Sequence, residues 1–160
     1  MTGFTLPENC KIVTLYGGAT TGINTRSDYV SCKNAHKVTI VGYHWGTTAA
    51  TQVLSLLEAA TVAAGSEAAV TKTFPIWKVI ATTSTDALAR QTDAASLTID
   101  PDGTDSTMLW VFEWHPSNFS AGLDCLAIKG TIGNAADYCV ILAFIEDRYQ
   151  QTTPPSAIVD

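Results

Sequence analysis

The chain has 160 residues, of which 46% are hydrophobic and only 15% are charged, and its formal net charge is -6. This length fits a single domain with a core of its own. The nine basic residues are scattered from Lys11 to Arg148. Nucleic-acid binding requires clustered positive charge, so this class of protein is disfavoured, as is adsorption to an anionic membrane.

The low charge content predicts a largely neutral surface, because an ordinary soluble domain has roughly 25% charged residues. A neutral surface is weakly solvated, and we interpret it as a sign that part of the surface is covered by a partner or by copies of the chain. A Thr-rich β surface with no partner is the alternative explanation.

The start of the chain, MTGFTLPENCK, lacks the charged and apolar regions of a secretory signal, and no run of 18 apolar residues occurs. We therefore expect synthesis in the cytoplasm without Sec export. The cysteines at positions 10, 32, 125 and 139 form no CxxC pair and no zinc-binding spacing. Buried free thiols are expected in such a compartment, although the even count leaves disulfides open.

Short β-branched and aromatic runs, separated by Gly, Asn, Asp and Pro, are typical of sandwiches and barrels. The predicted strands cover residues 10–18, 28–34, 36–45, 51–60, 75–83, 95–99, 106–115, 123–131 and 136–149. Residues 61–70 are predicted to form a loop, and a helical turn is possible in the loop after residue 115.

The segment 36–45 places Val38 and Ile40 on one face and Val41, Tyr43 and Trp45 on the other. Apolar side chains on both faces predict a strand that is covered on both sides. The segment 136–149 is the most apolar of the chain, so we place it centrally in a sheet.

The segment 106–115 alternates cleanly and is a strong strand prediction. Its two faces carry Met108, Trp110, Phe112 and Trp114 on one side and Leu109, Val111 and Glu113 on the other.

Together, eight or nine strands that all read as antiparallel predict an all-β, two-sheet sandwich, with a jelly roll as the favoured topology. The domain organisation that we predict is an N-terminal arm (1–9), a β-sandwich domain (10–149) and a C-terminal arm (150–160). Both arms are expected to be extended.

The C-terminal arm carries the candidate contact residues. Pro154 and Pro155 cannot donate to a sheet and favour an extended conformation, while Ile158 and Val159 make the end apolar. These four residues are predicted to form a docking peptide that contacts another protein or another subunit. A frayed terminus without a role is the alternative.

Little in the sequence points to catalysis or to a bound ion. His36, His44 and His115 are not accompanied by a GxSxG elbow or another local signature. Glu113 has no identifiable carboxylate partner for glycoside hydrolysis. We therefore predict no catalytic residue, no cofactor and no enzyme.

The best metal candidate is DPDGTD, in which Asp100, Asp102 and Asp105 could present oxygen ligands to calcium. This segment does not match the register of an EF-hand loop, and a hairpin turn explains it more simply. No metal site is therefore predicted. The tryptophans Trp45, Trp77, Trp110 and Trp114 could form a sugar-binding platform, but alternating aromatic residues in strands are more often core or interface.

Several segments resemble the decoration, or cement, proteins of tailed-bacteriophage heads. These segments are SDYVSCKNAHKVTIVGY, QVLSLLEAATVAAG followed by FPIWKV, MLWVFEW, FSAGLDCLAIKG and ILAFIEDRYQQTTPPSAIVD. They follow one another in order and cover most of the chain. The match is one of pattern and contains no catalytic signature.

This resemblance implies a jelly-roll protein on the exterior of the capsid of a virion, often a homotrimer, which clamps neighbouring major capsid proteins. The expected partners are the major capsid protein and other copies of the chain. The alternatives are a tail or fibre module that binds host carbohydrate, a neck or head-completion protein, and an enzyme such as a depolymerase.

Overall fold

The structure is a computed structural model, and it describes residues 6–17, 23, 26–46, 51–80, 86–99, 107–131, 138–149 and 156–159. Its helices are α1 (Leu6–Asn9) and the 3₁₀ turn η1 (Pro116–Asn118). Its strands are β1 (Lys11–Gly17), β2 (Val30–Ser31), β3 (Ala35–Trp45), β4 (Gln52–Ala59), β5 (Ala68–Ala69), β6 (Ile76–Ile80), β7 (Ala89–Arg90), β8 (Ser96–Ile99), β9 (Thr107–Trp114), β10 (Cys125–Gly130) and β11 (Tyr138–Asp147).

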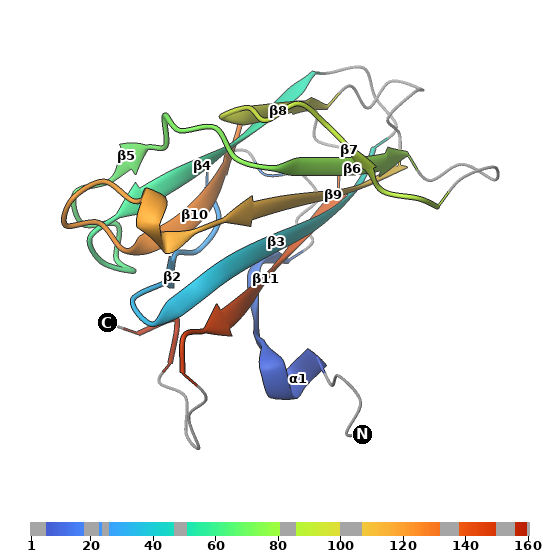
Figure 1. Cartoon of the computed structure of the whole chain (residues 1–160). Helices are drawn as coiled ribbons and strands as arrows, with labels where there is room; N and C mark the ends of the chain where they lie inside the picture. The colour runs from blue at the N-terminus through green and yellow to red at the C-terminus, as the bar shows by residue number, and fades with distance from the viewer. Residues whose placement is uncertain are drawn as a thin grey trace.

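These strands form two antiparallel sheets. The six-stranded sheet has the order β1-β11-β3-β9-β6-β7, and the five-stranded sheet has the order β2-β10-β4-β5, with β8 also paired to β4. Figure 1 shows β6, β9, β3 and β11 side by side in one layer. The predicted all-β, two-sheet sandwich is confirmed.

The strand pairing is nested in the manner of a jelly roll. Strand β1 pairs with β11, β2 with β10, β3 with β9 and β4 with β8. This is the pattern of one long antiparallel hairpin rolled up so that its successive pairs fall in alternate sheets. The segment between β4 and β8 adds β6 and β7 to the edge of the six-stranded sheet beyond β9.

The core lies between the two sheets and is built from the alternate positions of long strands. Trp110, Phe112 and Trp114 of β9 are almost completely buried and point inward, on the single strand face to which the alternation assigned them. Phe74 packs on Phe112 with a ring-centroid distance of 5.0 Å. Such aromatic contacts add stabilisation beyond the area that they bury.

Eight of the nine predicted strands contain a strand of at least four residues, whereas in the predicted strand 28–34 only Val30–Ser31 (β2) is strand. The final strand is internal, since β11 lies between β1 and β3. The predicted turn after residue 115 is η1. The two-residue strands β5 and β7 were not predicted; β5 lies inside the segment predicted as a loop.

The arms are not extended throughout. Residues 6–9 of the predicted N-terminal arm form the single turn α1. Within the predicted C-terminal arm, Ala157 is 95% buried and its carbonyl oxygen accepts a hydrogen bond of 2.7 Å from the backbone N–H of Ser31. Part of this arm therefore belongs to the sandwich.

Candidate docking surfaces

The outer face of the six-stranded sheet is lined by apolar side chains. The register aligns Thr14, Leu142, Val41 and Val111 in one row across β1, β11, β3 and β9. The next row contains Val140, Tyr43 and Leu109. We call the following ten residues the apolar face: Ile12, Val41, Tyr43, Trp45, Leu109, Val111, Tyr138, Val140, Leu142 and Phe144.

Nothing among the described residues covers much of this face. Tyr43, Trp45 and Val140 are 47%, 44% and 41% exposed. The prediction that the strand 36–45 is covered on both sides is therefore wrong for the described chain. Its inner face packs in the core, and its outer face is open. Contiguous apolar surfaces of this extent mark interaction sites on soluble proteins.

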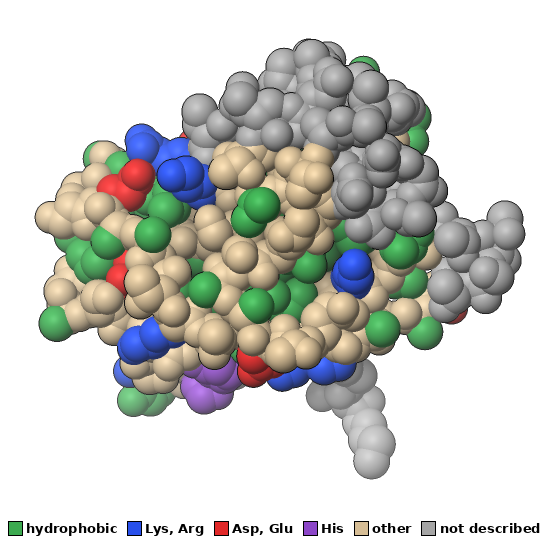
Figure 2. Space-filling view, turned by 90° about the horizontal axis from the view of Figure 1, so that it is seen from above, with side chains coloured by type: hydrophobic (Ala, Val, Ile, Leu, Met, Phe, Trp, Pro, Cys, Tyr) green, Lys and Arg blue, Asp and Glu red, His purple; other side chains and the backbone are tan. Residues whose placement is uncertain are grey.

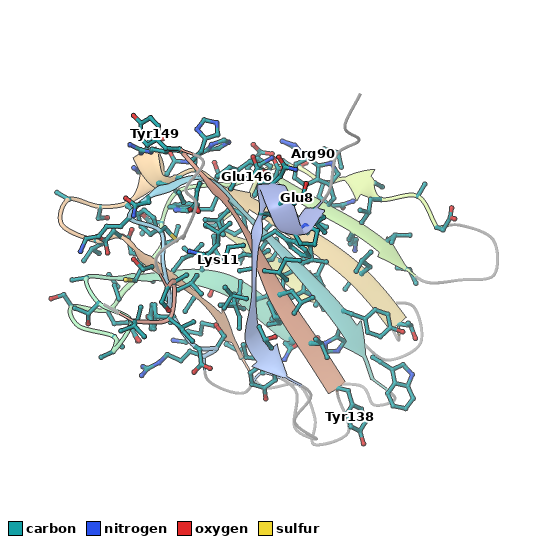
Figure 3. All side chains as sticks on the ribbon, turned by 90° about the horizontal axis from the view of Figure 1, so that it is seen from below. Glu8, Lys11, Arg90, Tyr138, Glu146 and Tyr149 are labelled. Carbon is teal, nitrogen blue, oxygen red and sulfur yellow. The ribbon has the colours of Figure 1, made fainter. Side chains whose placement is uncertain are left out.

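One end of the same sheet face is charged. Lys37 Nζ lies 3.0 Å from a carboxylate oxygen of Glu146 and 3.7 Å from one of Glu113. The hydrogen bond to Glu146 raises the pKa of Lys37, so the ammonium stays protonated. Figure 3 shows Glu146 and Tyr138 toward opposite ends of β11. The face is therefore polar at one end and aromatic at the other.

Replacing Lys37 by Gln is expected to lower the free energy of unfolding by about 0.5–1 kcal/mol, because two carboxylates then share one sheet face without a cation. The loss is expected to shrink in high salt. Urea denaturation measures it. The matched control is Lys33→Gln. The Lys33 side chain is 73% exposed and its Nζ lies 3.9 Å from Asp124 Oδ2, so its ion pair is longer and more exposed than that of Lys37. Equal effects of the two substitutions would contradict the prediction.

The outer face of the five-stranded sheet differs. Near β5 it is covered by the chain itself, since Val62 and Ala64 pack on Leu57 and Ala127. Tyr29 belongs to the same cluster and donates a hydrogen bond of 2.9 Å to Glu67 Oε2. Burial and this hydrogen bond raise the pKa of Tyr29.

Arg26 Nη1 reaches the same oxygen of Glu67 at 2.8 Å. The uncovered part of the outer face carries polar side chains, such as Ser55, Thr98 and Lys129. Seen from above the view of Figure 1, the described surface of the molecule is mostly neutral, with Lys and Arg in small separate groups (Figure 2).

A groove of about 710 Å³ runs along the first part of β1. Its opposite wall includes Tyr29 and the C-terminal residues Ser156, Ala157 and Ile158. The predicted contact residues Ile158 and Val159 are 60% and 63% exposed. Pro154 and Pro155 lie outside the described residues. The structure thus places the apolar end of the chain beside an open groove.

The four tryptophans do not form one platform. Trp110 and Trp114 are core residues, with exposures of 0% and 1%. Trp45 is exposed and stacks on Tyr138, with a centroid distance of 5.2 Å and an interplanar angle of 28°. The guanidinium of Arg90 lies over the ring of Trp77, with Arg90 Cζ 4.7 Å from the ring centroid.

The three histidines do not gather at one site. His44 is fully buried, whereas His36 and His115 are exposed and form a T-shaped contact with ring centroids 6.5 Å apart. No group of three or more possible metal ligands occurs in the described parts of the chain. The calcium candidate Asp100, Asp102 and Asp105 lies outside them.

All four cysteines are buried and none forms a disulfide. Burial raises the pKa of Cys139 to about 12, and it also raises the pKa of Cys32. Among the described residues, no helix is long and apolar enough to cross a membrane.

Sequence reasoning missed the apolar face as a site, although it assigned several of its residues to one side of a strand. The available signal was the apolar outward set of three strands: Val41, Tyr43 and Trp45; Leu109 and Val111; and Val140 and Leu142. What the sequence does not reveal is that these three strands are neighbours, because β3, β9 and β11 lie far apart along the chain.

No protein-family model matches the chain, and no curated protein matches it as a relative. Among solved structures, it is similar to the SPBc2 prophage-derived protein YomS, with 9% identity, a TM-score of 0.47, and coverage of 86% of this chain and 94% of that one. A structure titled "CBM4 structure and function" has 10% identity, a TM-score of 0.34, and coverage of 86% and 70%.

A third similar structure contains the CBM22-1 and GH10 modules of Clostridium thermocellum endo-1,4-beta-D-xylanase 10B, complexed with xylohexaose. It has 7% identity and a TM-score of 0.35, and the match covers 92% of this chain and 26% of that one. We carry no residue role over from these structures.

Proposed function

We propose that this protein is a structural protein of a tailed-phage virion, which binds the outer surface of the capsid and joins neighbouring major capsid proteins. The observation that carries the proposal is the apolar face, whose ten apolar side chains lie side by side on one sheet and are only partly covered by the described chain. Such a surface suits docking of another protein surface. The resemblance of the sequence segments to head-decoration proteins supplies the virion context.

Carbohydrate binding is the competing function, and the exposed pair of Trp45 and Tyr138 is the observation that favours it. Sugar sites also need polar groups that fix the hydroxyls. The described neighbours of this pair on the sheet face are Tyr43, Val140 and Thr107, which include neither an amide nor a carboxylate. The face therefore fits an apolar protein surface better than a sugar.

The C-terminal segment is the second contact that we propose. Ile158 and Val159 project from a segment that is itself anchored through Ala157. An anchored segment loses less conformational entropy on binding than a free tail. These two side chains can therefore add apolar contacts to a capsid protein at low entropic cost.

Capsids stripped of this protein are expected to regain it when the purified chain is added, and the variant I158K/V159K is expected to bind at least ~10-fold more weakly, because two apolar contacts are replaced by charges. This double substitution is sharper than deleting residues 151–160, which would also remove the core residue Ala157. The readout is copies bound per capsid, measured by quantitative gel analysis.

The matched control is Ala69→Lys, an exposed residue of β5 on the other sheet, which is expected to bind like the unmodified chain. Failure of the unmodified chain to bind any capsid would contradict the virion proposal. Binding to a glycan array without binding to capsids would favour the carbohydrate alternative.

A further inference from the structure

The footprint of the apolar face is about half of one side of a standard protein interface. Strands β1, β11, β3 and β9 are adjacent, and at about 4.8 Å between strands and about 3.3 Å per residue the apolar rows cover a footprint of roughly 400 Å². Protruding side chains raise the accessible area toward the roughly 800 Å² that each partner buries in a standard interface.

The outer side of the five-stranded sheet does not offer the apolar face a matching apolar surface. The apolar half of the five-stranded sheet's outer side is already covered by the loop that carries Val62 and Ala64. The remaining half presents Ser55, Thr98 and Lys129. A head-to-tail contact between copies would therefore bury apolar side chains against polar ones. A contact of the face with itself buries apolar against apolar.

The distribution of charge on the face also suits self-pairing. Glu113 and Glu146 lie at one end of the face and share Lys37. If the two-fold axis crosses the strands near Tyr43, the charged ends of the two copies lie on opposite rims of the interface. The centre is then apolar and aromatic and the rim is polar, which is the usual arrangement of protein interfaces.

We propose that the apolar face is a two-fold, isologous interface in which two copies of this chain pack sheet against sheet. Outer sheet faces that stack in this way bring their side chains together at about 10 Å between sheets. The inference rests on the proposed function: the apolar face joins two copies of the chain, and the C-terminal segment with Ile158 and Val159 is then the contact with the capsid. The two-fold pairing differs from the trimer that the resemblance implies, because a three-fold ring uses heterologous contacts.

The test is the molar mass of the purified full chain, measured by light scattering across the micromolar range. The expected mass is twice the 17.0 kDa of one chain. The variant Val140→Lys is expected to dissociate at least ~100-fold more readily, since a two-fold interface buries the new charge twice. The control Ala69→Lys, on the other sheet, is expected to remain a dimer.

Folding is checked for each variant by circular dichroism and a thermal melt. If Val140→Lys does not fold, Val140→Thr provides the milder change, with the same direction expected. A monomeric or trimeric mass for the unmodified chain would overturn the inference, and so would a dimer that is unaffected by folded variants at Val140.

Failure of this inference and failure of the proposed function give different results. A chain that is monomeric in solution but loses capsid binding through Val140→Lys would overturn the two-fold pairing and leave the capsid role standing. A chain whose dimer is broken by Val140→Lys, but which binds no capsid, would support the pairing and contradict the capsid role.

Discussion

Adding a single methyl group at residue 42 is expected to destabilise the sandwich by about 3 kcal/mol, near the upper end of what overpacking a core costs. Gly42 of β3 lies directly opposite Trp110 of β9. A Cβ atom built on Gly42 would overlap three atoms of the Trp110 indole ring. Because Trp110 is fully buried, the ring cannot move away without displacing its neighbours. The free energy of unfolding of Gly42→Ala, obtained from urea denaturation, measures the effect.

A double-mutant cycle isolates the cause. In the background Trp110→Leu, which is itself expected to be destabilising, the added cost of Gly42→Ala should fall well below its cost in the native background. The matched control is Gly17→Ala, because a Cβ there would meet only Thr14 Cγ2 at 3.8 Å. If Gly42→Ala costs the same in both backgrounds, the steric explanation is wrong.

This pair also illustrates what alternation in the sequence can predict. The period of a strand predicts that Trp110 and Phe112 share one face, and the structure confirms it. Their burial is what shows that this face is the inner one. That Trp110 lies over Gly42 could not be predicted, because it depends on the register between β3 and β9. Register is set by the packing of the whole sheet.

The candidate site was harder to predict than the fold. Alternation in 36–45 correctly separates the two faces of the strand, but the same pattern predicts cover on both sides. Only the structure shows that Tyr43 and Trp45 have no cover from the described chain. A sequence records which side chains are apolar, whereas the identity of the covering surface depends on what else is present in the assembly.

The C-terminal arm shows a similar limit. Its prolines and apolar end predict a segment outside the regular sheets. The anchoring of Ala157 depends on one backbone hydrogen bond to Ser31 and on a small side chain fitting the core. Neither has a local signature in the sequence, because a backbone hydrogen bond can be made by almost any residue.

The second large effect is a loss of stability in alkali that depends on the buried thiols. Burial raises the pKa of Cys139 from 9.0 to about 12 and raises that of Cys32 as well. Above pH 9 the unfolded chain releases these protons while the folded chain retains them. The stabilisation that the neutral thiols contribute is therefore fully present below pH 9. It is lost as the pH rises toward the folded pKa, by up to about 1.4 kcal/mol per pH unit for each thiol.

The variant Cys139→Ala is expected to be less stable at pH 7, because it leaves a small cavity, but its stability should decline less steeply between pH 9 and 11. Urea denaturation across this pH range measures the slope. The control Ile141→Val removes a core methyl group from the same face of β11 and should lower stability equally at every pH. Parallel pH profiles for the native chain and Cys139→Ala would show that this thiol does not contribute. The alkaline loss would then come from other groups whose pKa is raised in the fold, such as Cys10, Cys32, Tyr29 and Lys37.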